Sequence, residues 1–190
     1  MNETYQSMGI VTPKKINMLA IADCLNVKLR FWDDTSEATK IKGVHWIFLN
    51  EHLSPEEKWQ DFGHELCHVL QHSGYQWNLP FEFRLYQEVK AENFMHHFCV
   101  PTFMLQDYEF TNYYNFDDGV PLIAKNFNVT EEFAKIRLNQ YKKKVLQAHS
   151  DEEHRRYMES MYPKAPPYNE ETNKVLDQLN ALLIKKGVKV

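Results

Sequence analysis

The clearest chemical signal in this sequence is a pair of histidines four positions apart. Residues 64–68 read His-Glu-Leu-Cys-His, which is an H-E-x-x-H pattern. On a helix, residues four apart lie on one face, so the imidazoles of His64 and His68 can bind the same zinc ion. Glu65 lies about 100° around the helix from His64, where its carboxylate can serve as a general base beside the metal. The pattern therefore indicates a zinc site in which Glu65 is the catalytic residue.

The segment around these histidines carries the signals of a well-formed helix. Ser54 is a good N-cap, Pro55 suits the first helical position, and Glu57 completes a capping box. Apolar residues then recur on one side of the helix. The opposite side carries the polar residues Asp61, His64, Glu65, His68 and His72. A surface helix with solvated histidines is the alternative, but the gathering of titratable side chains on one face favours a functional site.

A catalytic zinc ion usually has three protein ligands, so a third ligand is expected elsewhere. The extended pattern H-E-x-x-H-x-x-G-x-x-H is excluded, because its glycine and third histidine would fall where this chain has Gln71 and Gly74. His72 lies a full turn beyond His68, which makes it a poorer alternative for the same ion. The better candidates follow in the next helix and are, in order, Glu88, Glu92 and His96.

Residues 81–100 read as a second long helix that ends before Pro101. Glu88 falls in the middle of its apolar side, among Phe81, Leu85, Ala91, Met95, Phe98 and Cys99. A carboxylate within an apolar surface is costly unless it is paired or bound to a metal, so Glu88 is the first candidate. A salt bridge at the edge of the core is the alternative. Glu92 is either another ligand or an outer residue that orients a ligating histidine.

The elements before the H-E-x-x-H helix predict a small sheet that covers its apolar side. Residues 13–24 have helical spacing, whereas 27–32 and 44–50 are rich in β-forming residues and read as strands. Residues 33–42 read as a polar loop, and 74–80 as a turn. We expect the strand 44–50 to lie at a sheet edge, where an extended substrate can pair with its residues His45, Trp46, Ile47 and Phe48.

The chain after the second long helix is predicted to be helical. Residues 120–144 read as two helices around an Asn-containing turn, with Thr130 capping the second. Their spacing is similar to that of a DNA-binding helix-turn-helix, but Glu131 and Glu132 at the start of the second helix disfavour contact with phosphates. The second helix is expected to end near Lys144.

Together these elements predict an α+β fold in three parts. Residues 1–107 form the zinc-site core, in which a small N-terminal sheet packs on a zincin-type helix pair. Residues 108–148 form a helical unit that packs on this core. Residues 149–190 form a tail with a short charged helix, a proline-containing linker and an amphipathic last helix.

Composition places the chain among ordinary globular proteins. The net charge is -4 and the pI is near 6.1, so no dedicated surface for nucleic acid or an anionic membrane is expected. Cys24, Cys67 and Cys99 are far apart and odd in number, which fits a reducing compartment rather than a disulfide framework. No signal peptide or membrane-spanning apolar run is recognisable, so we expect a cytoplasmic protein.

Three segments resemble the ImmA/IrrE metallopeptidases of phages, integrative elements and bacterial stress regulation. They are HELCHVLQH at 64–72, EVKAENFMHHFCVP at 88–101 and IAKNFNVTEEFAKIRL at 123–138. The resemblance covers about positions 13 to 143 and leaves the tail outside it.

The resemblance implies a ligand set and a general base. His64, His68 and Glu88 match the family's zinc ligands, and Glu65 matches its base. The sequence departs from the family in having Cys67 where glycine is usual. In the second segment, Lys-Ala-Glu replaces the common Glu-Ala-Asn, and Phe-Met replaces the common Phe-Ala. None of these departures removes a ligand or the base.

The motif and the resemblance together predict a zinc-dependent endopeptidase with one zinc ion per chain. The resemblance implies a protein substrate, typically a helix-turn-helix repressor encoded alongside, whose cleavage derepresses a mobile element. His45, Tyr75 and Tyr86 are candidates for stabilising the oxyanion. One alternative is a non-catalytic metal-binding module that binds a repressor, although such a module would not need the base. Another is a DNA-binding regulator built on residues 120–143, with strongly salt-dependent affinity for duplex DNA.

Overall fold

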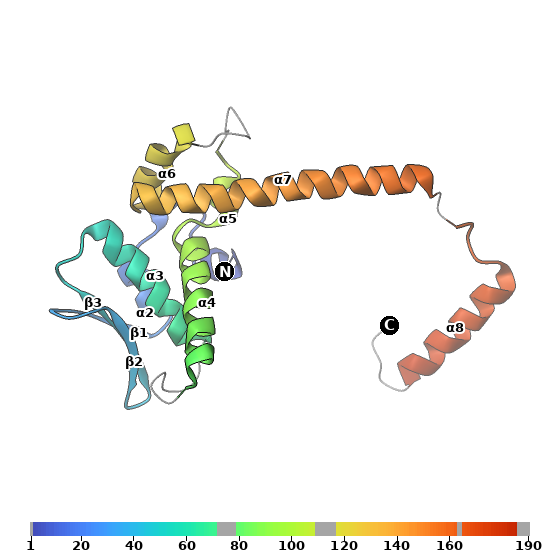
Figure 1. The fold of residues 1–190 in the computed structure, drawn as a ribbon. Helices are drawn as coiled ribbons and strands as arrows, with labels where there is room; N and C mark the ends of the chain where they lie inside the picture. The colour runs from blue at the N-terminus through green and yellow to red at the C-terminus, as the bar shows by residue number, and fades with distance from the viewer. Residues whose placement is uncertain (1, 72–78, 109–116, 163–164, 186–190) are drawn as a thin grey trace. The chain divides into compact units, whose positions relative to one another are not determined.

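A computed structural model describes residues 2–71, 79–108, 117–162 and 165–185 of the chain (Figure 1). Residues Met1–Val145 form one compact unit and residues Leu146–Val190 a second. In chain order, the elements are α1 (Asn2–Ser7), η1 (Pro13–Lys15), α2 (Met18–Cys24), β1 (Val27–Trp32), β2 (Glu37–Ile41), β3 (Val44–Asn50), α3 (Pro55–Gln71), α4 (Phe81–Cys99), α5 (Thr102–Leu105), η3 (Asp117–Gly119), α6 (Val120–Phe127), α7 (Glu131–Met161) and α8 (Glu170–Lys185). The predicted α+β class, with a small N-terminal sheet followed by helices, is confirmed.

The sheet has three strands in the order β1-β3-β2. β1 pairs with β3 in parallel, and β2 pairs with β3 antiparallel. The two residues that link β2 to β3 both have positive φ, 50° at Lys42 and 84° at Gly43. These values are typical of a type I′ hairpin turn. The turn pairs Ile41 with Val44 and so sets the register of the hairpin.

β2 lies within residues 33–42, so our expectation of a polar loop there is wrong. Its sequence is Glu-Ala-Thr-Lys-Ile, and three of these residue types are depleted in strands. The local pattern therefore argues against a strand. Pairing with β3 supplies the backbone hydrogen bonds that make this segment extended.

The expected edge strand is also wrong, because β3 is the central strand. It has a neighbour on both sides, so His45, Trp46, Ile47 and Phe48 do not lie at a sheet edge. Ile47 is fully buried, whereas Trp46 and Phe48 are partly exposed on the opposite face. In the part of the chain that the structure describes, the edge strands of the sheet are β1 and β2.

The helix predicted over 13–24 is divided in two, η1 and α2. Asn17 has extended backbone between them, and its side-chain oxygen accepts a hydrogen bond from the N–H of Ala20 at 3.0 Å. Asn17 is therefore the N-cap of α2. This short polar side chain competes with helix continuation, and periodicity alone did not reveal it.

α3 begins with the predicted capping box and packs between the sheet and α4 (Figure 1). The Ser54 hydroxyl accepts a hydrogen bond from the N–H of Glu57 at 3.2 Å, and the Glu57 carboxylate accepts one from the N–H of Ser54 at 2.9 Å. These bonds lower the pKa of Glu57, because they stabilise its charged form. The apolar side of α3 is buried through Trp59, Phe62 and Leu66.

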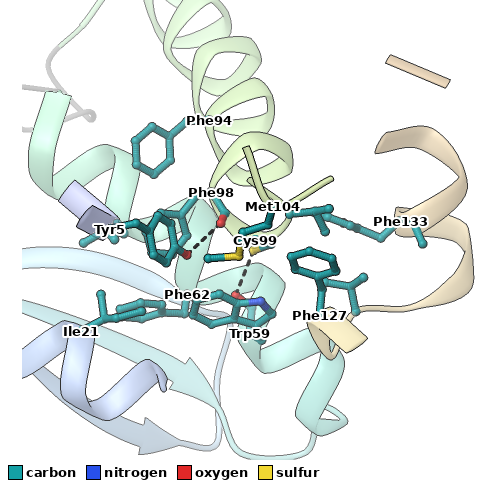
Figure 2. Close-up of a cluster of buried hydrophobic side chains, with 14 of the residues drawn as sticks. Tyr5, Ile21, Trp59, Phe62, Phe94, Phe98, Cys99, Met104, Phe127 and Phe133 are labelled. Carbon is teal, nitrogen blue, oxygen red and sulfur yellow. Dashed lines mark hydrogen bonds between the residues drawn. The ribbon is translucent and has the colours of Figure 1, made fainter. Parts of the chain in front are cut away.

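Figure 2 shows the centre of the core, where aromatic side chains of α1, α3 and α4 meet. The hydroxyl of Tyr5 donates a hydrogen bond to the carbonyl of Phe98 at 2.8 Å. Burial raises the pKa of Tyr5, so the hydroxyl keeps the proton it donates. Cys99 Sγ lies 3.5 Å from the carbonyl oxygen of Trp59, which joins α4 to α3.

α3 and α4 approach each other closely at Gly63. A Cβ at this position would lie 2.8 Å from Cys99 Sγ and 3.3 Å from Phe98 Cδ1. The first distance is too short for carbon and sulfur, so any larger residue would push the helices apart. Gly63 therefore allows the helix contact that also sets the spacing of the histidines from α4.

We expect Gly63→Ala to lower the free energy of unfolding by about 1–3 kcal/mol, because overpacking outweighs alanine's better helix propensity. Urea unfolding of the full chain measures this change. Cys99→Ala provides a matched test, because it removes the sulfur atom that the new methyl group meets. The double variant should lose less stability than the sum of the two single changes. Simple additivity would show that this contact does not limit the helix spacing.

The helix pair predicted over residues 120–144 is present as α6 and the first part of α7. Asn128 closes α6 in the left-handed conformation, with φ of 53°. The Thr130 hydroxyl accepts a hydrogen bond from the N–H of Phe133 and so caps α7. Thr130 also accepts one from the side chain of Gln60 at 3.0 Å, which joins the pair to α3.

Arg137 connects α7 to the segment after α4. It is fully buried, and it donates from Nε to the carbonyl of Val100 at 3.0 Å and from Nη2 to Thr102 Oγ1 at 2.7 Å. Burial lowers its pKa to about 10, so the guanidinium remains charged at neutral pH. The division of the first compact unit at residues 107 and 108 stays a prediction.

α7 continues to Met161, so the separate charged helix expected after Ser150 is wrong. The intervening residues contain no glycine or proline, and i,i+3 and i,i+4 ion pairs support the charged part. Glu152, for example, pairs with both Arg155 and Arg156. Within α8, whose residues are all described, no side chain is buried.

None of the helices in the described part of the chain has the length and apolar character needed to cross a membrane.

Candidate metal centre

Two neighbouring helices bring the three predicted ligands together. α3 supplies His64 and His68, and α4 supplies Glu88. His64 Nε2 lies 3.2 Å from His68 Nε2 and 3.2 Å from Glu88 Oε2. His68 Nε2 lies 3.7 Å from Glu88 Oε1. Residues far apart in the sequence thus present two ring nitrogens and a carboxylate to one point.

These separations fit a zinc ion. Zinc–nitrogen bonds of about 2.0–2.1 Å in a tetrahedral site place neighbouring ligand atoms about 3.4 Å apart. Two histidines and one carboxylate are also a common donor set of catalytic zinc sites, in which a fourth position stays open. The His68 side chain is 10% exposed and that of Glu88 is 46% exposed, so one side of the cluster faces solvent. The residues present therefore fit a zinc ion that a substrate can reach.

The burial expected for Glu88 is wrong, although its place near the histidines is as expected. Of the predicted apolar side of α4, Ala91, Phe98 and Cys99 are buried, whereas Phe81 and Leu85 near the start of the helix are 66% and 54% exposed. The full set of residues on the buried side is Gln87, Ala91, Phe94, His96, Phe98 and Cys99. Glu88 lies at the border of that side, where it reaches the histidines of α3.

The other candidate ligands do not join this cluster in the part of the chain that the structure describes. Glu92 is exposed on α4. The ring of His96 is buried against Phe133, with centroids 4.5 Å apart, and burial is the main cause that lowers its pKa. His72 and the oxyanion candidate Tyr75 lie outside the described residues. Tyr86, another oxyanion candidate, is exposed on α4.

Glu65 occupies a position with strong electrostatic consequences. Its pKa is raised to about 8, first by burial and then by the negative charges of Asp61 and Glu88. A hydrogen bond from the backbone of Ala38 acts in the opposite direction, because an N–H donor favours the carboxylate. A dication held by the neighbouring histidines would act in the same direction as the Ala38 hydrogen bond. It would lower the pKa of Glu65 and favour the carboxylate, which is the basic form.

Ala38 is a site residue that sequence reasoning missed. It lies on β2, the strand that was expected to be a loop, and its backbone contacts the Glu65 carboxyl. The available signal was the Lys-Gly pair at 42–43 directly before the strand 44–50, a plausible hairpin turn that implies a partner strand.

Cys67 is buried beside the cluster but is not one of its members. Burial raises its pKa to about 11, so its thiol stays protonated at neutral pH. Its Sγ lies 4.0 Å from the carbonyl oxygen of Lys90 on α4. Cys67 therefore behaves as a small packing residue between the two helices.

A second group of possible ligands consists of Asp33, Glu51 and His52. Asp33 follows β1 and Glu51 follows β3, so the carboxyl ends of two parallel strands bring them together. All three are exposed, and His52 already pairs with Asp33. This pairing accounts for the arrangement without a metal ion.

The three candidate ligands lie within the first compact unit, so deleting residues 163–190 is expected to leave zinc binding unchanged. Chelator competition on the truncated and full-length chains measures both dissociation constants. Circular dichroism of the truncated chain serves as the folding control. A truncated chain that folds poorly and loses zinc would show that the tail contributes to the core.

Comparison of the sequence with known proteins identifies the family of this chain. The model of the peptidase M78 family, described as the IrrE N-terminal-like domain, matches residues 22–139. The phage-like element PBSX protein XkdA of Bacillus subtilis (strain 168) is 44% identical over 140 residues, which are 74% of this chain and 70% of XkdA. The uncharacterized protein YqaB of the same organism is 35% identical over 143 residues, 75% of this chain and 82% of YqaB. No solved structure matches the chain. The chain belongs to the peptidase M78 family, the metallopeptidases with an IrrE N-terminal-like domain, which confirms the resemblance to ImmA/IrrE proteins.

Proposed function

We propose that the protein is a zinc-dependent endopeptidase. The observation that carries this proposal is the convergence of His64, His68 and Glu88 within 3.2–3.7 Å of one another, with Glu65 directly next to His64. Membership of a metallopeptidase family supports the same reaction class. A bound zinc ion would supply Lewis acidity that polarises the scissile carbonyl and the attacking water.

Glu65 is the residue that moves protons in this proposal. Its carboxylate accepts a proton from the attacking water and then donates it to the leaving amine. The backbone of Ala38 holds this carboxylate from the side of β2. Partial burial of Glu65 keeps bulk water from competing for the same proton.

The edge of β2 is the proposed site for the substrate backbone, in place of β3. Among the described residues, β2 pairs with a strand on one side only, which is the side of β3, so it is an edge strand of the sheet. The contact between Ala38 and Glu65 places this edge beside the base. An extended peptide that adds to the edge would gain backbone hydrogen bonds without requiring a particular sequence.

The proposed substrate is a helix-turn-helix repressor of a phage or mobile element. The name of XkdA refers to a phage-like element, and the ImmA/IrrE resemblance implies such repressors as substrates. Direct binding of nucleic acid is not part of the proposal. The first turn of α7 carries the exposed carboxylates Glu131 and Glu132, which would repel phosphates.

The test is cleavage of a purified repressor encoded beside the gene for this protein. Zinc-loaded protein should cut it into defined fragments, seen by mass spectrometry, and a chelator should abolish the cut. Elemental analysis should give about one zinc ion per chain. Tight repressor binding without any cleavage would instead identify a non-catalytic regulatory module. Retention of Glu65 favours the enzyme, because a binding module needs no base.

A further inference from the structure

Ser36, directly before β2, links three elements next to the metal centre. Its hydroxyl donates a hydrogen bond to Asp61 Oδ2 of α3 at 2.5 Å. The same hydroxyl oxygen accepts a bond from the N–H of Asn50, the last residue of β3, at 3.2 Å. Both contacts are partly buried, and a hydrogen bond to a carboxylate is stronger than one between neutral groups. Ser36 therefore joins the start of β2 to the end of β3 and to α3.

Asp61 places this link beside the proposed base. It precedes Glu65 by one helical turn, so both carboxyl groups lie on the same face of α3. They are close enough for the charge of Asp61 to act on Glu65. A movement of β2 away from Asp61 would therefore also move it away from Glu65.

The outer edge of β2 presents defined backbone groups. The two-residue turn makes Ile41 and Val44 a hydrogen-bonded pair, and such pairs alternate along an antiparallel hairpin. Thr39 and Glu37 therefore bond to β3, whereas the backbone groups of Ala38 and Lys40 point outward. The bond from Ala38 to Glu65 agrees with this alternation.

The two ends of β2 are held by different means. The turn at Lys42 and Gly43 fixes one end. The other end begins after Ser36, in a strand of which three of the five residues are of types depleted in strands. An unsupported end of a five-residue edge strand frays readily. The Ser36–Asp61 bond is placed where it prevents such fraying.

We propose that Ser36 and Asp61 are positioning residues that hold the outer edge of β2 against α3. They act through Ala38, whose N–H orients Glu65, and through Lys40, whose outward-pointing backbone groups would receive the substrate. The role in substrate binding rests on the proposed function, whereas the role in holding β2 does not. Neither residue belongs to the ligand cluster.

Amide hydrogen exchange on the full-length, zinc-loaded protein tests the structural part without a substrate. Ser36→Ala and Asp61→Ala should each accelerate exchange in residues 37–41 by about tenfold or more, with β1 unchanged. Ser36→Thr keeps a hydroxyl and should restore slow exchange. Asp34→Asn is the matched control, because Asp34 lies in the same loop and its carboxylate accepts a hydrogen bond from the N–H of the neighbouring Thr35. Unchanged exchange in both alanine variants, or equal acceleration in β1, would overturn the proposal.

Kinetics separate positioning from a general loss of stability. In both alanine variants, KM for a cleaved repressor should rise about tenfold while the zinc dissociation constant stays within about twofold of wild type. Ser36→Thr should return KM to the wild-type value. A lower kcat at unchanged KM would support only the orientation of Glu65 by Ala38 and would contradict the role in receiving substrate. If the wild type cleaves nothing, the proposed function fails, and the exchange experiment still decides the role of Ser36 and Asp61.

Discussion

Glu65→Gln is expected to bind zinc as tightly as the wild type while kcat falls by about 10²–10⁴-fold. Glutamine has nearly the same shape as glutamate, and its amide can accept the bond from the Ala38 backbone, so the local structure should persist. It cannot accept a proton from the attacking water, which removes the base. Repressor cleavage measured under single-turnover conditions gives the change in rate, and chelator competition gives the zinc affinity.

The matched variant is His68→Ala, which removes a ligand and leaves the base in place. It should lose both zinc and activity, and added zinc should not restore the rate. The two variants together separate failure of the metal site from failure of proton transfer. Undiminished cleavage by Glu65→Gln would rule out the proposed mechanism, because in that mechanism Glu65 is the group that accepts the proton of the attacking water.

Glu88→Gln is expected to weaken zinc binding by more than the roughly 10–100-fold that loss of an outer partner costs. The Glu88 carboxylate faces both histidine rings, at 3.2 Å from His64 and 3.7 Å from His68. Its negative charge offsets the charge of the dication, and a neutral amide does not. The side chain is 46% exposed, so the substitution leaves no buried polar group unpaired and should not unfold the protein. Chelator competition gives the dissociation constant.

Glu92→Gln is the control for this prediction, because it makes the same chemical change one turn along the same helix. Glu92 is exposed and lies outside the ligand cluster, so zinc affinity should remain close to that of the wild type. The Tm of each variant in the metal-free form should agree with that of the metal-free wild type. A larger loss of zinc affinity in Glu92→Gln than in Glu88→Gln would mean that the third ligand is assigned to the wrong residue.

The structure changes the reason for choosing Glu88 without changing the choice. Its expected burial among apolar residues rested on a helical wheel, which shows the faces of a helix but not which face meets the core. In the structure, the buried face of α4 is set by contact with α3, at Gly63 and Cys99. Glu88 lies about three turns before Cys99 on α4 and faces His64 of α3.

The helix that holds the histidines could be predicted from the sequence alone, because its signals are local. The capping box of Ser54 and Glu57 acts within one turn, and the spacing of His64 and His68 places them on one face whatever surrounds the helix. The turn at Asn128 and the cap at Thr130 were predictable for the same reason. The metallopeptidase family also followed from short motifs, and the family comparison confirms it.

Only the tertiary structure decided which strand borders the site. Strand order depends on pairing between distant segments, so residues 44–50 alone could not show that β3 is the central strand. Residues Glu37–Ile41 became a strand only because they pair with β3. The same limit applies to Ala38 and Ser36, whose partners lie on α3. Local sequence specifies which side chains share a helix face, whereas packing between α3, α4 and the sheet determines what each face meets.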